Sequence, residues 1–174
     1  MSNSSNEHKK KTLNKLNFAI FICSTSRYNQ NKDKILDVSG DNIIKMIREA
    51  GHNVKIKKII ADDKNMIIKA LKEIFYLPDI HAAIFSGGTG ITPTDITIET
   101  ITPFLEKILP GFGEIFRQTS FKEIGAAAIL SRAIAGLAKD KVVYCIPGSP
   151  NAVRISVERL ILPETAHIIK HLRE

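Results

Sequence analysis

The stretch of the chain most suggestive of chemistry is a glycine-rich run that follows a short apolar segment. It reads Ser86-Gly87-Gly88-Thr89-Gly90. Three glycines in four positions let the backbone adopt positive φ and approach a ligand closely, and the N–H groups can then point at an anion. The run is neither a Walker A loop nor a GxGxxG fingerprint. It predicts a phosphate-binding loop or, alternatively, only a tight turn from a strand into a helix.

Acidic residues come after this run and after an earlier apolar segment. Asp95 lies five residues beyond Gly90, and Asp62 and Asp63 follow the run that ends at Ile60. A carboxylate beside a phosphate-binding loop repels the ligand unless a cation lies between them, and Mg²⁺ is the usual cation. The same acids could instead cap or start helices. Both interpretations stay open at this point.

A second candidate anion site follows another apolar run. It reads Pro147-Gly148-Ser149-Pro150. Ser149 is a natural N-cap and Pro150 a natural first helical residue, so a well-formed helix start explains the loop equally well. His167 and His171 are four residues apart but have no third ligand in the sequence, and no Ser-His-Asp arrangement is apparent.

The elements that must position these loops alternate between short apolar runs and helical patterns. The run from Ser24 to Asp37 is expected to be a polar loop, after which Ser39 or Asp41 could cap a helix that Gly51 ends. That helix would turn Ile43, Met46, Ile47 and Ala50 inward, and the next would turn Ile67, Leu71, Ile74 and Phe75 inward. Strands are expected over residues 17–24, 54–60, 81–86 and 141–146, with a further helix from about Asn151.

This alternation predicts an α/β fold, a three-layer sandwich around a mostly parallel sheet. Such sheets bind ligands at the carboxyl ends of their strands. Ser24, Gly87 and Pro147 each follow a predicted strand directly. If those strands are parallel, the three loops open on one edge of the sheet.

Composition limits the remaining possibilities. The 174 residues suit a single domain, which we expect to span residues 16–174 after a disordered basic tail over residues 1–15. The tail holds four lysines against one glutamate, which accounts for three of the seven net positive charges, and the chain has no tryptophan, so we expect no nucleic-acid partner. The sequence shows no secretory signal and no apolar run of membrane-spanning length, so a cytoplasmic protein without a membrane partner is expected. Cys23 and Cys145 are expected to be buried reduced thiols.

Four motifs in order and spacing make the chain resemble the MoaB/MogA family of molybdenum-cofactor biosynthesis, and its MoaB branch in particular. The glycine run with Asp95 is the first. The others are Pro110-Gly111-Phe112-Gly113-Glu114, Ile129-Leu130-Ser131-Arg132-Ala133 and Ile146-Pro147-Gly148-Ser149. The resemblance runs from about Leu16 to the C-terminus and implies the molybdopterin-binding fold of that family.

The resemblance implies a reaction and a set of residues. The reaction is Mg²⁺-dependent transfer of AMP from ATP to the terminal phosphate of molybdopterin, with release of pyrophosphate, on the way to a molybdenum or tungsten cofactor. The two functional aspartates of the family match Asp62 and Asp95, which would be catalytic and would hold Mg²⁺. Asp63 is then the helix cap. The predicted substrate-binding residues are Ser24, Ser86, Gly87, Gly88, Thr89, Gly90, Ser131, Pro147, Gly148 and Ser149.

Two further expectations come from the same resemblance. Members of the family form trimers, and MoaB-branch members can form hexamers, so a homotrimer or homohexamer is expected. The main alternative function is a related protein that binds molybdopterin without adenylylating it. The retained acid at Asp62 argues for the active enzyme.

Overall fold

The computed structural model describes residues 15–30 and 37–174. The tail expected over residues 1–15 therefore lies outside the described residues except for Lys15. In chain order the elements are β1 (Asn17–Cys23), α2 (Thr25–Tyr28), α3 (Val38–Glu49), β2 (Asn53–Ile60), α4 (Lys64–Phe75), β3 (Ala82–Ser86), α5 (Thr97–Ile101), the 3-10 turn η2 (Thr102–Phe104), β4 (Lys107–Ile108), α6 (Pro110–Ile124), the 3-10 segment η3 (Gly125–Leu130), β5 (Ile134–Ala138), β6 (Lys141–Ile146), α7 (Pro150–Ser156), the π-helical segment η4 (Val157–Ile161) and α8 (Leu162–Leu172).

The strands form one six-stranded sheet in the order β2-β1-β3-β6-β5-β4. Strands β2, β1, β3 and β6 are parallel, whereas β5 runs antiparallel to both β6 and β4. The prediction of a mostly parallel sheet is confirmed. The antiparallel β5 lies between β6 and the short edge strand β4.

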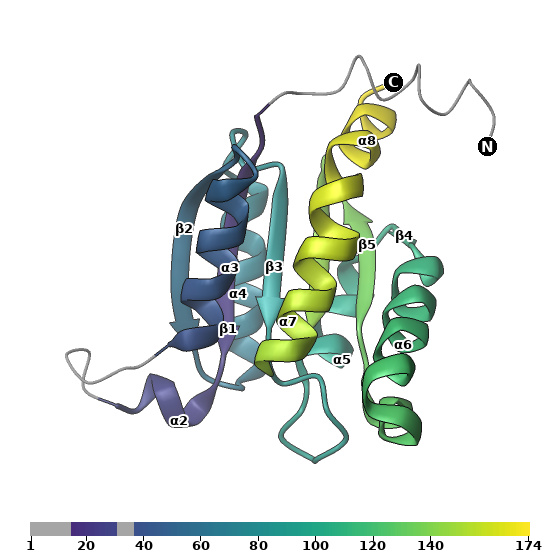
Figure 1. Ribbon diagram of the computed structural model, residues 1–174. Helices are drawn as coiled ribbons and strands as arrows, with labels where there is room; N and C mark the ends of the chain where they lie inside the picture. The colour runs from purple at the N-terminus through teal and green to yellow at the C-terminus, as the bar shows by residue number, and fades with distance from the viewer. Residues whose placement is uncertain (1–14, 31–36) are drawn as a thin grey trace.

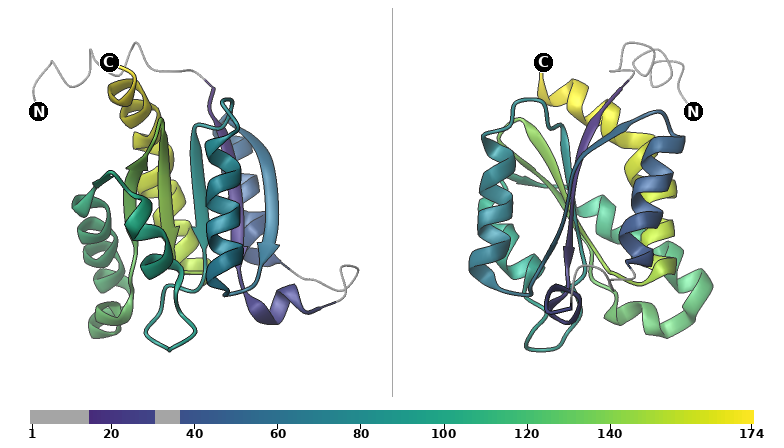
Figure 2. Two further views of the ribbon diagram at one scale, coloured as in Figure 1. Left: turned by 180° about the vertical axis from the view of Figure 1, so that it is seen from behind. Right: turned by 90° about the vertical axis from the view of Figure 1, so that its left-hand side faces the viewer.

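Helices cover both faces of this sheet, which makes the three layers (Figures 1 and 2). Helices α3, α7 and α8 lie on one face and α4 and α5 on the other, while α6 packs at the end of the sheet that holds β4 and β5. The right-hand view of Figure 2 shows the sheet edge-on between the two helical layers. None of the helices in the described part of the chain is long and apolar enough to cross a membrane.

Strand β1 shows how the sequence builds a core on both faces. Phe18, Ile20 and Ile22 belong to the apolar cluster under α3 and α8, and the alternate residues Phe21 and Cys23 belong to the cluster under α4. Successive side chains of a strand point to opposite faces, so a strand buried on both faces needs an unbroken apolar run. The same holds for β3 and β6, in which every residue is buried.

The connection between β1 and α3 differs from the sequence prediction. The expected polar loop contains a short helix, α2, and helix α3 is capped by Asp37, whose side chain accepts a hydrogen bond from the Gly40 N–H at 3.0 Å. The prediction of Ser39 or Asp41 as the cap is therefore wrong. Ala50, expected on the inner face, is exposed at the end of the helix. The helix begins earlier than the apolar periodicity indicates, because its first turn buries Ser39 and Gly40 rather than large apolar side chains.

Candidate active site

The loops after β1, β3 and β6 meet at the carboxyl edge of the sheet, as the sequence predicts. Ile22 pairs with Ser86, and Ser86 pairs with Ile146, so the three neighbouring strands end in register. Gly148 packs directly on the glycine run, since a Cβ at Gly148 would lie 3.4 Å from the Gly87 Cα. The two candidate anion loops are therefore in contact.

The glycine run needs its first two glycines for steric reasons. Gly87 has φ of 106°, and a Cβ there would lie 2.2 Å from the Cys23 carbonyl oxygen. Gly88 has φ of 60°, and its Cβ would lie 2.5 Å from Thr97 Oγ1 and 2.7 Å from Asp62 Oδ1. Any other residue would be strained in φ and would displace its neighbours. The run is thus a close-packed backbone loop beside a carboxylate.

The amides of the run differ in whether they are available to a ligand. The Gly87 N–H donates to the Ile146 carbonyl at 2.9 Å, and the Gly90 N–H is directed to the Asp95 carboxylate. The N–H groups of Gly88 and Thr89 have no acceptor among the described residues. Unpaired amides at a loop of this kind attract anions. Of the amides in the predicted phosphate-binding loop, therefore, only those of Gly88 and Thr89 are available to a ligand in the described structure.

Asp62 connects three of the loops. Its Oδ2 accepts hydrogen bonds from the Thr25 N–H at 2.8 Å and the Thr25 hydroxyl at 2.9 Å, and the Thr25 hydroxyl in turn accepts from the Asp62 N–H. Its Oδ1 is buried beside Gly88 and has no hydrogen-bond partner in the described structure. A buried carboxylate oxygen without a partner is energetically costly unless a donor or a cation satisfies it.

Asp63, the adjacent acid, has a different role. It is the N-cap of α4, and its Oδ1 accepts a hydrogen bond from the Met66 N–H at 2.8 Å. Its side chain is exposed, whereas Asp62 is half-buried. The assignment of Asp63 as the helix cap is confirmed.

Asp95 lies against the last glycine of the run. Its Oδ2 accepts from the Thr92 hydroxyl at 2.6 Å and the Thr92 N–H at 2.9 Å, and it would lie 2.7 Å from a Cβ at Gly90. The hydroxyl of Thr92 is the main cause that lowers the pKa of Asp95, with further contributions from the backbone amides of Thr92 and Gly90 and from Arg132. Asp95 is consequently an anion at neutral pH. It does not cap α5, which has no side-chain cap.

A small cavity of about 190 Å³ opens beside the glycine run. It brings together seven of the predicted site residues, and adds Leu130 and Arg132, which the sequence analysis did not select. The predicted residues that line it are Gly88, Thr89, Gly90, Asp95, Ser131, Pro147 and Gly148.

Arg132 holds the glycine run from the other side. Its Nε donates to the Thr89 carbonyl at 2.9 Å, and its guanidinium forms an ion pair with Glu99. One signal in the sequence could have identified it, because Arg132 is the only charged residue between Gly125 and Ala138. A charged side chain in such an apolar stretch indicates a specific partner.

The remaining predicted residues are not among those that line the cavity, and three serines among them support the loops around it. Ser24 caps α2 and Ser149 caps α7, each through a side-chain contact of 3.4 Å to a backbone N–H. The buried Ser86 directs its hydroxyl to the Pro147 carbonyl at 3.4 Å. Together with Asp62 and Gly87, these residues do not line the cavity itself.

The acids at this edge have the chemistry of a divalent-cation site. Mg²⁺ prefers carboxylate oxygens and commonly uses one or two of them together with substrate phosphates. Asp62 supplies an unpaired buried oxygen beside Gly88, and Asp95 an ionised carboxylate beside Gly90. Among the described residues no group of three or more histidine, cysteine or acidic side chains could hold a metal alone. Asp62 and Asp95 therefore suit a cation whose remaining coordination positions are filled by phosphate oxygens of a substrate.

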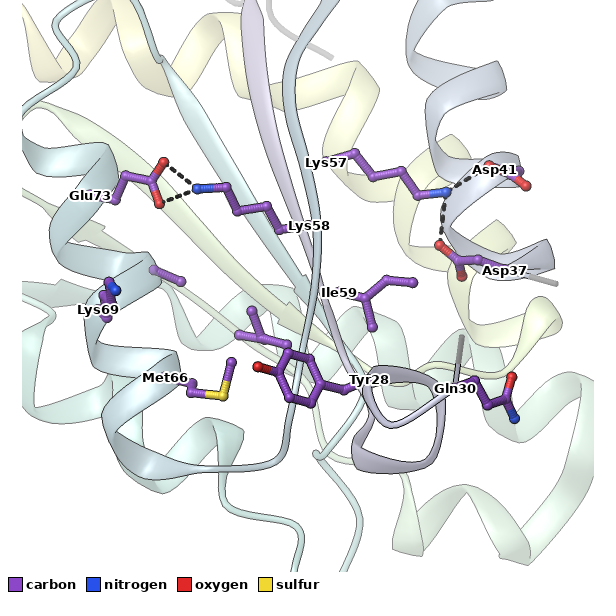
Figure 3. Close-up of a pocket in the computed structure, with 12 residues that line it drawn as sticks. Tyr28, Gln30, Asp37, Asp41, Lys57, Lys58, Ile59, Met66, Lys69 and Glu73 are labelled. Atoms are coloured by element: carbon purple, nitrogen blue, oxygen red, sulfur yellow. Dashed lines mark hydrogen bonds and ion pairs between the residues drawn. The ribbon is translucent and has the colours of Figure 1, made fainter. Parts of the chain in front are cut away.

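A larger hollow of about 760 Å³ lies elsewhere, along the open edge of strand β2. Figure 3 shows that two of its lysines point at acidic side chains: Lys57 reaches Asp37 and Asp41, and Lys58 reaches Glu73. Burial acts to lower the pKa of Lys57, but its hydrogen bonds to the two aspartates outweigh that effect and raise it. The charges of Lys57 and Lys58 are thus matched within the protein.

The thiol nearest the loops is not a nucleophile. Cys23 is free and buried at the end of β1, and Cys145 is free and buried on β6, which confirms the prediction for both. Burial, with a smaller contribution from the nearby Asp62 charge, raises the pKa of the Cys23 thiol to about 12, although a hydrogen bond with Thr97 acts to lower it. The thiolate is the reactive form, so covalent catalysis by Cys23 is disfavoured.

Comparison with known families identifies the kind of domain to which this candidate site belongs. Residues 19–167 match the family described as "Probable molybdopterin binding domain". The chain belongs to this molybdopterin-binding family. The match contains all the loops described above and ends within α8.

Curated members of the family are similar over almost their whole length. The "Probable molybdopterin adenylyltransferase" of Methanocaldococcus jannaschii is 41% identical over 94% of this chain and 98% of its own. The "Molybdenum cofactor biosynthesis protein B" of Bacillus cereus is 41% identical over 93% of this chain and 94% of its own.

Solved structures of family members share the fold. A structure of molybdenum cofactor biosynthesis protein B superposes with a TM-score of 0.84 at 39% identity, covering 91% of this chain and 96% of its own. The tungsten cofactor synthesizing protein MoaB from Pyrococcus furiosus gives 0.78 at 38% identity, covering 94% and 99%. The predicted MogA/MoaB-like fold is confirmed.

Proposed function

We propose that this protein is a molybdopterin adenylyltransferase, which transfers AMP from ATP to the terminal phosphate of molybdopterin during synthesis of a molybdenum or tungsten cofactor. The observation that carries the proposal is the pair of acids beside the glycine loop, Asp62 next to Gly88 and Asp95 next to Gly90, together with the two unpaired amides of that loop. A relative named for this activity is 41% identical across nearly the full chain. The two observations are independent and point to the same reaction.

The residues divide into cation ligands and phosphate ligands. Asp62 and Asp95 would hold Mg²⁺, which supplies charge neutralisation at the ATP phosphates when bound. The Gly88 and Thr89 amides would bind the phosphate of molybdopterin, since they lack acceptors in the described structure. Ser131, Pro147 and Gly148 would form the rest of the cavity wall, while Ser24, Ser86 and Ser149 hold the loops in place.

The reaction requires little acid–base catalysis from the protein. An oxygen of the molybdopterin phosphate bonds to the α-phosphorus of ATP, and the bond from that phosphorus to the β-phosphate oxygen breaks, so pyrophosphate leaves. The attacking phosphate is already an anion, so no strong general base is needed. Catalysis then rests on alignment and electrostatics. Arg132 contributes to alignment because it fixes the Thr89 carbonyl, and with it the direction of the loop.

The test is a direct assay with a distinguishing control. The full chain is incubated with molybdopterin, ATP and Mg²⁺, and both AMP-molybdopterin and pyrophosphate are measured. We expect the two products in equal amounts, and none when Mg²⁺ is chelated. Molybdopterin binding without either product would instead support the alternative, a non-catalytic binding protein of the same family.

We also propose that the protein is a homotrimer or homohexamer in the cytoplasm. Five of the large apolar side chains that the described residues expose lie on α6 and η3: Ile115, Phe121, Ile124, Ile129 and Leu130. Contiguous exposed apolar surface commonly marks a protein interface. The two free cysteines suit a reducing compartment. Light scattering after size-exclusion chromatography would measure the mass, and a monomer would contradict the assembly.

A further inference from the structure

Helix α8 carries a pair of histidines whose rings face each other. His167 and His171 lie one helical turn apart, and their Nε2 atoms are 2.9 Å apart. The ring centroids are 4.6 Å apart and the rings are tilted by 59°. Both side chains reach solvent, since His167 is 27% exposed and His171 is 52% exposed. The pair is thus accessible, with two ring nitrogens close enough to bind one ion.

Each histidine is held from behind by a carboxylate. The Nδ1 of His167 lies 3.2 Å from Glu164 Oε2, and the Nδ1 of His171 lies 2.9 Å from Glu174 Oε2. Glu174 also lies 3.6 Å from the Lys170 ammonium. A carboxylate on the outer nitrogen fixes the tautomer and orientation of a histidine that binds a metal through its other nitrogen.

The protonation of the two rings decides what can lie between their Nε2 atoms. A hydrogen on each Nδ1 satisfies both glutamates and leaves an unshared electron pair on each Nε2. Two electron pairs that face each other across 2.9 Å repel. A cation between them removes the repulsion, and that cation is either a single shared proton or a metal ion. The two glutamates supply negative charge that balances such a cation.

We propose that His167 and His171 form a chelate for a late first-row divalent metal, with Glu164 and Glu174 as the groups that orient the rings. Imidazole nitrogens suit nickel, copper and zinc. With metal–nitrogen bonds of about 2.0–2.1 Å, the observed separation of 2.9 Å corresponds to an angle near about 90° at the metal. That angle favours the tetragonal geometry of Ni²⁺ or Cu²⁺ over tetrahedral Zn²⁺.

The chelate is separate from the proposed active site. The C-terminal half of α8 lies at the end of the sheet opposite to the loop that follows β3 (Figure 1). In the described part of the chain no third histidine, cysteine or acidic residue completes a closed metal cage. The remaining coordination positions are therefore open to water or to a ligand from another molecule.

Calorimetric titration of the full chain with Ni²⁺, in a buffer that does not bind metals, tests the proposal. We expect one Ni²⁺ per chain at this site, and at least 10-fold weaker binding in His167→Asn and in His171→Asn. The double variant should lose binding at this site altogether, because neither ring nitrogen remains. Zn²⁺ should bind more weakly than Ni²⁺.

Two further variants separate a built site from adventitious binding. Glu174→Gln should weaken Ni²⁺ binding by about 10-fold, the lower end of the effect of such supporting groups. His52→Asn is the matched control, because His52 has no histidine partner in the described structure and its substitution should leave the titration unchanged. Binding that is absent, or that is equal in wild type and His171→Asn, would overturn the proposal and leave a shared proton between the rings. Neither result bears on adenylyl transfer.

Discussion

The two hollows of this protein differ in the state of their polar groups more than in their size. The hollow along β2 is about four times the volume of the cavity beside the glycine run, yet two of its three lysines, Lys57 and Lys58, are paired with acids of the same hollow. The cavity at the carboxyl edge has the opposite character. It is bordered by two amides without acceptors, and the buried Asp62 oxygen behind it has no partner in the described structure.

The contrast shows how an active site can be located when no ligand is present. Charges that satisfy one another on an edge strand protect the strand from pairing with other chains, and lysines serve this purpose in many proteins. Unpaired donors and acceptors in a buried setting are costly, and several of them gathered at one loop point to a ligand that completes them. By this criterion we infer that the smaller cavity is the active site, and substitutions in the two regions should have unequal effects.

The largest effect is expected from Asp95→Asn. Asparagine keeps the size of the side chain but removes the negative charge that would hold Mg²⁺. Pyrophosphate release should fall by about 100-fold or more, as it commonly does when one electrostatic contribution to a transition state is lost. Molybdopterin binding, measured by equilibrium titration, should remain within a factor of a few. Wild-type turnover in this variant would remove Asp95 from the mechanism.

Gly88→Ala should have the next largest effect, and the chain offers a matched control. A methyl group at Gly88 would press on Asp62 and Thr97, whereas Gly125 has nearly the same φ, 61°, with open space around it. Each substitution should cost roughly 1–3 kcal/mol of stability through backbone strain. Only Gly88→Ala should lower turnover, by about 10-fold or more. Thermal melts measure the loss of stability in both variants, and rate measurements give their turnover. Equal losses of turnover in the Gly88 and Gly125 variants would mean that backbone strain alone is responsible.

The smallest effect is expected in the hollow along β2. Lys58→Met breaks an exposed ion pair with Glu73, and such pairs contribute about 0.2–1 kcal/mol. Turnover and molybdopterin binding should stay at wild-type values. A clear loss of either would mean that this hollow takes part in substrate binding.

The sequence predicted the parallel part of the fold well because three of its four strands are mainly apolar runs followed by a turn signal. Strands β1, β3 and β6 and the loops after them lie where the pattern placed them. The antiparallel β4 and β5 have no comparable signature, because β4 has two residues and β5 is made mainly of small residues that also suit a helix. The early start of α3 was missed because its cap, Asp37, stands before a turn without large apolar residues on its buried side.

The sequence predicted only part of the candidate site. Motifs placed the glycine run, Asp95 and Ser131 at one cavity, but spacing alone does not show which backbone amides are already used within the fold. The Gly87 amide is one of these, because it donates to Ile146 on the neighbouring strand. Arg132 was missed as a site residue because its role depends on the Thr89 carbonyl, 43 residues earlier in the chain.

The neighbouring acids Asp62 and Asp63 allow the most direct test of the central claim, that unpaired polar groups at the carboxyl edge perform the chemistry. Asp62→Asn keeps an oxygen that can accept the Thr25 hydrogen bonds but removes the charge, and Asp63→Ala removes the α4 cap. The measurement is the rate of pyrophosphate release by both variants, with thermal melts in parallel. We predict that Asp62→Asn loses turnover while Asp63→Ala keeps it and loses about 1 kcal/mol of stability. Full activity in Asp62→Asn, or loss of activity only in Asp63→Ala, would contradict the account.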